Sequence, residues 1–301
     1  MISVKRIFAF DAFEPIELSS YDLVFHGDTV DERTKIISSK IAKQCTPAAS
    51  HTIKWSQDTQ SIEIEGVSFS SAEIKNKFSS ASPVSILFDA TSLDFPELVY
   101  LFDCFKGYDI DILYLEPAEY LKKQSDIGEY NFDLTSKQSR FTGLRNFTVH
   151  TGGTAVSLVA PLGFEPMRLG QLLNTDESKQ YHSISGMVGV PAYKPGWENR
   201  SIKSNLRHFV SSQSPELLIY PSTNLYQIYK QIEDISAAYP KLLLAPLGTK
   251  PSTVAIAMFI VNKFSSNSRH NFVGAVYDFP IKTSGRSKGI GKAYIYKTSY
   301  C

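Results

Sequence analysis

Two short segments of the chain share a residue pattern that suits the binding of an anion. The pattern is Ala-Pro-Leu-Gly, two variable residues and Pro, and it occurs at 160–166 and again at 245–251. Apolar residues precede each copy and a helix-like run follows it, with Arg168 after the first copy and Lys250 in the second. A strand that turns through glycine into a helix presents unpaired N–H groups and the positive end of the helix dipole, both of which attract phosphate.

Each residue type in this pattern has a local role. The first proline lacks an N–H and ends the strand, whereas the second proline suits the first turn of the helix. The glycine permits a positive φ or a close approach of a ligand to the backbone. We therefore expect both turns to line one crevice at the carboxyl edge of a sheet. The alternative is that the pattern is only favourable turn chemistry. The predicted ligand-binding residues of the two turns are Gly163, Arg168, Gly248, Thr249, Lys250 and Ser252.

An earlier segment, 23–36, loosely repeats this plan, with an apolar strand, a glycine, acidic residues, Arg33 and a helix. In the Ala-Pro-Leu-Gly copy at 160–166, Glu165 precedes Arg168 by three residues. Such a pair on a first helical turn forms a structural ion pair in one interpretation. In the other, the carboxylate accepts a ribose hydroxyl while the arginine meets a phosphate.

A basic, glycine-rich segment near the end of the chain could also contact an anion. From Phe279 onward the sequence has Lys and Arg residues but neither Asp nor Glu. In one interpretation the loop at 283–292 closes over the ligand, with Arg286 and Lys288 reaching it. In the other, it is a solvated surface loop before an edge strand.

Carboxylates at predicted strand ends are the candidate catalytic groups. Asp89 and Glu165 are named for this role, although carboxylates are too common at such positions to define a mechanism. The sequence lacks GxxxxGK[ST], a GxGxxG between strand and helix, HExxH and GxSxG. These absences count against an ATPase, a dinucleotide-dependent dehydrogenase and a metal enzyme, so no metal or cofactor is predicted.

Composition describes an ordinary globular chain. Its 301 residues are 43% hydrophobic and 20% charged, and the formal net charge is +1. That charge argues against a broad nucleic-acid surface. No apolar run is long enough to span a membrane, and three widely spaced cysteines suit a reducing compartment. We expect a cytoplasmic protein.

The elements that must position these residues alternate along the chain. Apolar strand candidates that are each followed by a helix predict an α/β fold: a Rossmann-like, mostly parallel sheet or sheets with helices on both faces. Alternating polar and apolar residues at 51–56 and 61–69 predict a small antiparallel hairpin near the amino-terminal edge. The predicted organisation is an amino-terminal unit at 1–120, a connecting segment at 121–154 and a carboxyl-terminal unit at 155–301. The predicted helices lie at 31–45, 94–107, 165–174, 198–212, 225–238 and 252–264.

Two fragments carry a resemblance to a known family. Thr-Gly-Gly-Thr at 151–154 and Leu-Gly-Thr-Lys at 247–250 resemble parts of the T-G-G-T-K loop of CRISPR-associated Rossmann-fold (CARF) nucleotide sensors. The first fragment lacks the lysine and the second lacks the double glycine. The resemblance implies a site for cyclic or linear oligonucleotide messengers, with Gly248, Thr249 and Lys250 at the phosphate. It also implies a role in bacterial defence and dimerisation across the ligand site.

Three functions follow as expectations. The first is a cytoplasmic protein that binds a nucleotide or another phosphorylated small ligand, as a sensor or accessory component of a defence system. The second is a hydrolase acting on nucleotides or nucleosides. The third is a subunit that binds a protein partner encoded in the same operon and has no ligand of its own; homodimerisation is a further possibility.

Overall fold

A computed structural model describes residues 1–79, 85–124, 130–132, 134–149, 156–174, 181–210, 214–264 and 272–300. The chain divides into two compact units, and unit 1 is built from both ends of the chain. Unit 1 comprises Met1–Leu121 and Thr283–Cys301, and unit 2 comprises Lys122–Lys282. The sequence placed 283–301 in the carboxyl-terminal unit, whereas this segment pairs with strands of unit 1.

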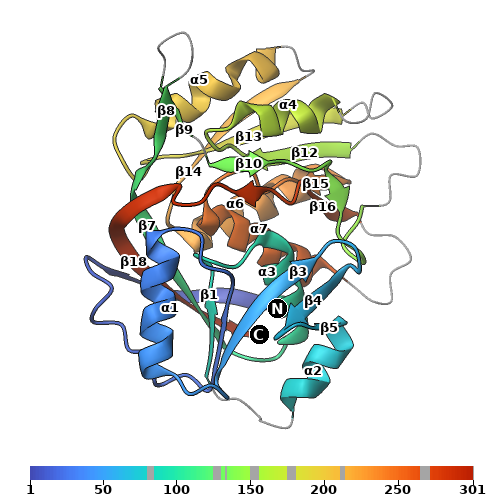
Figure 1. The fold of residues 1–301 in the computed structure, drawn as a ribbon. Coiled ribbons are helices and arrows are strands. Elements are labelled where there is room, and N and C mark those ends of the chain that lie inside the picture. The colour runs from blue at the N-terminus through green and yellow to red at the C-terminus, as the bar shows by residue number, and fades with distance from the viewer. Residues whose placement is uncertain are drawn as a thin grey trace. The chain divides into compact units, whose positions relative to one another are not determined.

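Unit 1 is organised around one eight-stranded sheet of order β1-β18-β7-β6-β2-β3-β4-β5 (Figure 1). Its strands are β1 (Ile2–Phe10), β2 (Leu23–His26), β3 (Ser50–Ser56), β4 (Ser61–Ile64), β5 (Val67–Phe69), β6 (Ile86–Asp89), β7 (Ile110–Tyr120) and β18 (Ser287–Tyr300). Its helices are α1 (Glu32–Gln44), α2 (Ser71–Ser79) and α3 (Phe95–Cys104).

The predicted fold class, a Rossmann-like, mostly parallel sheet with helices on both faces, is wrong, and the sheet of unit 1 overturns it. Only the pairs among β7, β6, β2 and β3 are parallel, while β1–β18, β18–β7, β3–β4 and β4–β5 are antiparallel. The sheet is therefore mixed and mostly antiparallel. The physical reason is that β18 returns from the far end of the chain and inserts between β1 and β7. β1 itself is largely exposed although most of its residues are apolar.

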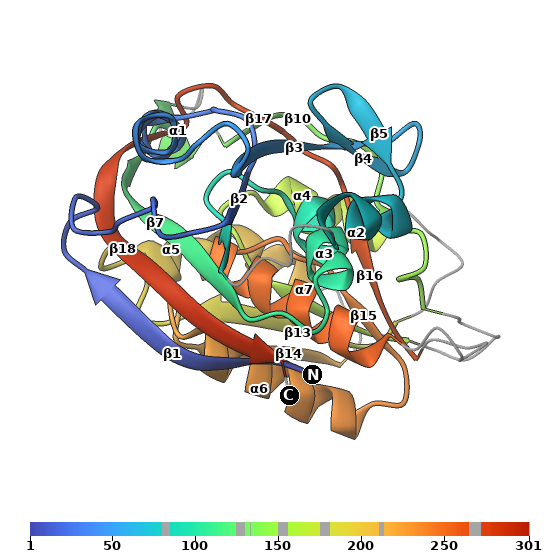
Figure 2. The same cartoon turned by 90° about the horizontal axis from the view of Figure 1, so that it is seen from below.

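Helices cover both faces of the parallel part of this sheet because its strands are apolar on both sides. Val24 and Leu87 face one core, to which α1 contributes Ile37 and Ile41. Their neighbours on the strands face the other way and form an aromatic cluster with α2 and α3. In that cluster Phe25 packs edge-on against Phe78 and Phe88 against Phe102. Figures 1 and 2 show α1 against β18, and α2 beside α3.

Unit 2 contains a six-stranded sheet of order β11-β16-β15-β12-β13-β14, in which only β11–β16 is antiparallel. Its strands are β11 (Thr142–Gly143), β12 (Val156–Pro161), β13 (Tyr181–Gly189), β14 (Pro215–Tyr220), β15 (Leu242–Leu244) and β16 (Val273–Tyr277). Two small ladders pair β8 (Lys122–Gln124) with β9 (Tyr130–Phe132), and β10 (Thr135–Lys137) with β17 (Ile281–Lys282).

The helices of unit 2 lie in two layers (Figure 1). α4 (Pro166–Asn174) and α5 (Trp197–Val210) lie over one face of the sheet, and α6 (Leu225–Ala238) and α7 (Lys250–Lys263) lie over the other. Leu169 of α4 and Phe209 of α5 pack on Leu158 and Leu243 of the strands. The positions predicted for helices are confirmed by α1 and α3 to α7. Within the described residues, no helix is long and apolar enough to cross a membrane.

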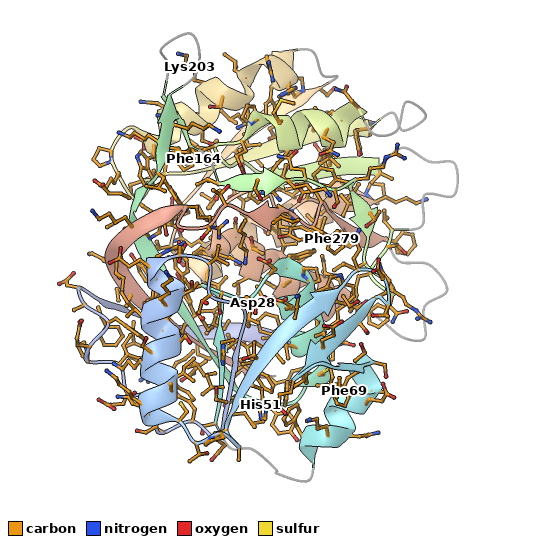
Figure 3. All side chains as sticks on the ribbon, in the orientation of Figure 1. Asp28, His51, Phe69, Phe164, Lys203 and Phe279 are labelled. Carbon is orange, nitrogen blue, oxygen red and sulfur yellow. The ribbon has the colours of Figure 1, made fainter. Side chains whose placement is uncertain are left out.

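His51 on β3 is a buried titratable group within the aromatic cluster of unit 1 (Figure 3). Its ring lies 4.8 Å from Phe78 and 5.7 Å from Phe25, centroid to centroid. Burial lowers the pKa of His51, while Glu65, whose carboxylate lies 3.6 Å from Nδ1, acts in the opposite direction. The folded chain therefore binds this proton less readily than the unfolded chain does.

This lowered pKa predicts an acid-sensitive stability. The unfolded histidine takes up a proton as the pH falls through about 6.5, whereas the folded one resists, so the free energy of unfolding should decrease below that pH. His51→Phe, which keeps an aromatic ring among the phenylalanines, should remove part of this decrease. Urea unfolding between about pH 8 and pH 5 measures it. Equal pH dependence in the wild type and the variant would contradict the prediction.

Candidate functional site

The two Ala-Pro-Leu-Gly turns lie side by side at the carboxyl edge of the unit 2 sheet. β12 and β15 are parallel neighbours, so both chains leave the sheet at the same edge. A Cβ on Gly163 would overlap the carbonyl oxygen of Leu247. A Cβ on Gly248 would lie 2.8 Å from Cβ of Pro161. Both glycines are therefore required by the close approach of one turn to the other.

This pair of turns marks the point where the connections of the sheet diverge. From β12 the chain continues through α4 to β13 on one side, and from β15 it continues through α7 to β16 on the other side. In open α/β sheets, ligands bind in the crevice outside the strand ends at such a switch point. The predicted turns thus occupy the position in unit 2 where a ligand is expected.

The second turn leads directly into α7. Thr249 is the N-cap residue, and its side chain makes no capping hydrogen bond to the helix. The Thr249 hydroxyl instead lies 3.5 Å from the hydroxyl of Tyr220. Lys250 is the first helical residue and Pro251 the second, and Gly248, Thr249 and Lys250 are all half-buried. Ser252, by contrast, is fully buried and donates to the Thr249 carbonyl at 2.7 Å.

The first turn is bound by a side chain of α5, and an aromatic cluster lies beside it. Asn205 donates to the Gly163 carbonyl at 2.9 Å. Phe164, the next residue (Figure 3), lies 4.7 Å from Phe132 and 5.5 Å from Trp197 between ring centroids. The guanidinium of Arg200 lies 4.3 Å above the Phe132 ring. Phe132 and Trp197 are far apart in the sequence, and no local pattern indicated that their side chains meet.

Arg168 does not point its charge at a ligand. Its Nε and Nη2 donate to the two carboxylate oxygens of Asp278 at 2.7 and 2.6 Å, and both side chains are buried. Burial alone lowers the pKa of Arg168, but the hydrogen bonds and charge of Asp278 raise it above its ordinary value. This bidentate ion pair joins the start of α4 to the end of β16. Of the two interpretations of Arg168, the structure therefore has the ion pair, although the partner is Asp278 and not Glu165.

The two candidate catalytic carboxylates belong to different units. Glu165 is half-buried in the first turn and accepts a hydrogen bond from the Thr135 hydroxyl at 2.8 Å. Asp89, at the end of β6 in unit 1, is 1% exposed. It accepts from the backbone N–H of Thr91 at 2.9 Å and from the Ser92 hydroxyl. Burial raises the pKa of Asp89. Through these hydrogen bonds Asp89 stabilises the turn that follows β6.

Arg286 and Lys288 belong to unit 1, at the start of β18. Nε of Arg286 lies 3.8 Å from the Asp31 carboxylate, which also binds Arg33 at 2.8 Å. Lys288 is exposed and lies opposite Glu119 of β7. The segment predicted to close over a ligand is therefore partly a sheet strand. The Thr-Gly-Gly-Thr fragment at 151–154 lies outside the described residues.

No protein-family model, curated protein or solved structure matches the chain. Within the described residues, no group of three or more His, Cys, Asp or Glu side chains could hold a metal ion. The function is therefore inferred from the geometry of the unit 2 turns.

The ion pair of Arg168 leads to a test of its structural role. Arg168→Met should lower the free energy of unfolding by about 3–5 kcal/mol, because Asp278 is left buried without its partner. The double variant Arg168→Met/Asp278→Leu should recover most of that loss, since both charges are then removed together. Urea unfolding measures all three chains. A single variant as stable as the wild type would show that the pair does not hold the unit together.

Proposed function

We propose that unit 2 binds a nucleotide or another phosphorylated small ligand at the carboxyl edge of its sheet, beside the ends of β12 and β15. The observation that carries this proposal is the contact between the two turns. It brings Gly163 and Gly248 together at the switch point and sets the amino end of α7 beside them. A ligand at this edge would meet half-buried residues of both turns.

The phosphate would lie at the start of α7. The first turn of a helix offers N–H donors and the positive end of the dipole, and a following lysine adds a full charge. Lys250 is in the first turn, and the Thr249 side chain makes no capping hydrogen bond to the N–H groups of that turn. Because Arg168 is bound to Asp278, the proposal does not include it in the anion site.

The base or other flat part of the ligand would lie towards the first turn. Phe164 immediately follows Gly163 and is half-buried, as is Trp197. Aromatic side chains stack on nucleotide bases and tolerate different bases. The ligand class is therefore one with a phosphate and a flat ring a short distance apart, which describes a nucleotide.

The proposal extends to the biological role that the Leu247–Lys250 resemblance implies. The chain would act in the cytoplasm as a nucleotide sensor, or as an accessory component of a bacterial defence system. Binding is favoured over turnover because Glu165, the acidic residue of the first turn, is held by the Thr135 hydroxyl.

The test is a thermal-melting assay with mononucleotides and with short linear and cyclic oligonucleotides. A ligand that binds the folded chain raises its melting temperature. Lys250→Ala should lower the affinity for that ligand by about tenfold, the usual effect of removing one charge-assisted hydrogen bond. Lys203→Ala is the matched control, because Lys203 lies on an exposed part of α5 (Figure 3).

The control should shift as the wild type does. If no nucleotide of the panel raises the melting temperature, or if Lys250→Ala and Lys203→Ala respond alike, the α7 site is not a phosphate site.

A further inference from the structure

Unit 1 contains a pocket of about 400 Å³ at the amino ends of its parallel strands. It lies beside Ile86 at the start of β6 and Asp109 just before β7, and the middle of β1 and the end of β18 complete it. Its volume is within the range of small-ligand sites. The sequence gave no sign of it, because its lining comes from both termini of the chain and from the residues before β6 and β7.

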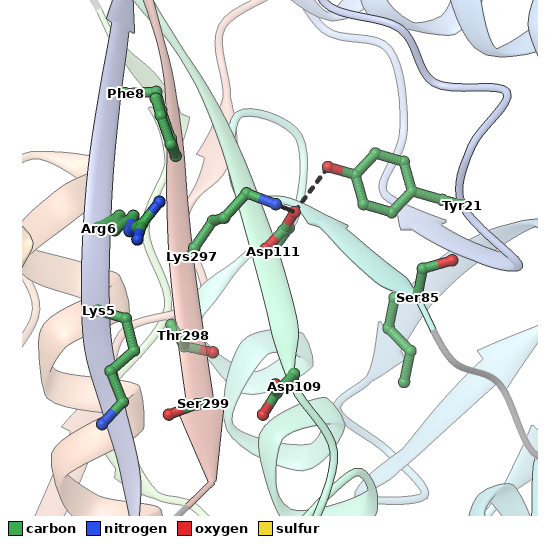
Figure 4. Close-up of a pocket in the computed structure, with 11 residues that line it drawn as sticks. Lys5, Arg6, Phe8, Tyr21, Ser85, Asp109, Asp111, Lys297, Thr298 and Ser299 are labelled. Atoms are coloured by element: carbon green, nitrogen blue, oxygen red, sulfur yellow. Dashed lines mark hydrogen bonds and ion pairs between the residues drawn. The ribbon is translucent and has the colours of Figure 1, made fainter.

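The floor of the pocket is a row of charged side chains across three strands. Arg6 of β1 lies opposite Lys297 of β18, which in turn lies opposite Asp111 of β7. Figure 4 shows these three side chains side by side, with Tyr21 across from them. Directly opposite residues on antiparallel strands point to the same face, and like charges in such a pair repel. Arg6 and Lys297 are a pair of this kind.

The Asp111 carboxylate is already occupied by protein groups. Nζ of Lys297 lies 3.1 Å from its Oδ2, and the Tyr21 hydroxyl donates to the same oxygen at 2.8 Å. Burial, followed by the charge of Asp111, raises the pKa of Tyr21, so this hydroxyl remains a donor. Within the described part of the chain, the Arg6 guanidinium has no hydrogen-bond or ion-pair partner. Its repulsion with Lys297 is therefore only partly offset by Asp111.

A β-bulge adds a further cation to this pocket. Consecutive residues of a regular strand point to opposite faces. The register between β1 and β18 shifts between Val4 and Arg6, which inserts Lys5 as an extra residue. As a result Lys5 and Arg6, although adjacent in sequence, both line the pocket. Bulges commonly re-aim side chains next to binding sites.

The β7 side of the pocket offers an acceptor, across from the cations of β1. Asp109 accepts from the backbone N–H of Tyr300 through Oδ1 at 3.2 Å, and among the described residues its other oxygen accepts no hydrogen bond. Ser85 lines the pocket on the Tyr21 side (Figure 4). A ligand that fits must therefore present an oxyanion at one end and hydroxyl donors at the other.

We propose that this pocket binds the phosphate ester of a small polyol. The phosphate lies against Arg6 and the two lysines, where it relieves the repulsion between Arg6 and Lys297. The polyol hydroxyls donate to Asp109. Phe8 and Ile86 give the carbon chain an apolar contact.

Calorimetric titration of the full chain with ribose 5-phosphate, inorganic phosphate and ribose tests this assignment. Ribose 5-phosphate should bind more tightly than inorganic phosphate, and ribose alone should give no measurable binding. Arg6→Ala should lower the affinity for ribose 5-phosphate by about tenfold or more. Asp109→Asn should make the affinity for ribose 5-phosphate equal to that for inorganic phosphate. The asparagine keeps an acceptor for the Tyr300 N–H. Arg140→Ala, an exposed arginine of unit 2, is the control.

Lys250→Ala separates this pocket from the proposed site in unit 2 and should leave the titration unchanged. The assignment is overturned if wild-type chain does not bind ribose 5-phosphate, if Arg6→Ala binds it as the wild type does, or if Lys250→Ala alone abolishes binding. Arg6 is exposed, so its replacement should leave the melting temperature without ligand unchanged.

Discussion

The arrangement of unit 2 depends on the absence of a side chain at Gly163. The carbonyl oxygen of Leu247 occupies the space where a Cβ would be, and Gly248 meets Pro161 in the reciprocal direction. Because the two turns touch, the chains that leave β12 and β15 diverge from one point of the sheet edge. The amino end of α7 then lies beside both turns, where we propose that its backbone N–H groups and Lys250 meet a ligand. The glycines thus act through packing, and the proposed ligand site depends on this contact.

Unit 1 repeats this constraint with different residues. A Cβ on Gly27, after β2, would lie 2.8 Å from the carbonyl oxygen of Ser92, after β6. β2 and β6 are parallel neighbours, as β12 and β15 are in unit 2. Each unit also has a buried arginine in the helix that follows. Arg33 binds Asp31 and the Leu115 carbonyl of β7, whereas Arg168 binds Asp278. In both units the arginine is buried and paired with a carboxylate of the same unit.

The features set by residues close together in the sequence were predictable, and those set by residues far apart were not. The strands that end at Pro161 and after Leu244, and the helices that follow them, were predictable because apolar runs, prolines and glycines act locally. The sheet of unit 1 was not, because β18 pairs with β1 across nearly the whole chain and neither β1 nor the first half of β18 has a buried pattern. The partner of Arg168 lies 110 residues away, so the sequence suggested Glu165 instead. The row of Arg6, Lys297 and Asp111 is likewise a product of strand pairing.

The most direct measurement of this account is the stability of Gly163→Ala by urea unfolding, with Gly170→Ala as its matched control. The account predicts that Gly163→Ala loses about 1–3 kcal/mol, the usual cost of forcing extra volume into a packed region, because the backbone of Leu247 cannot move aside. Gly170→Ala lies within α4, where the nearest atoms to its Cβ belong to the His208 side chain and not to the backbone, so it should lose less stability than Gly163→Ala. A Gly163→Ala chain with wild-type stability would contradict the claim that contact between the two turns holds this edge of the sheet together.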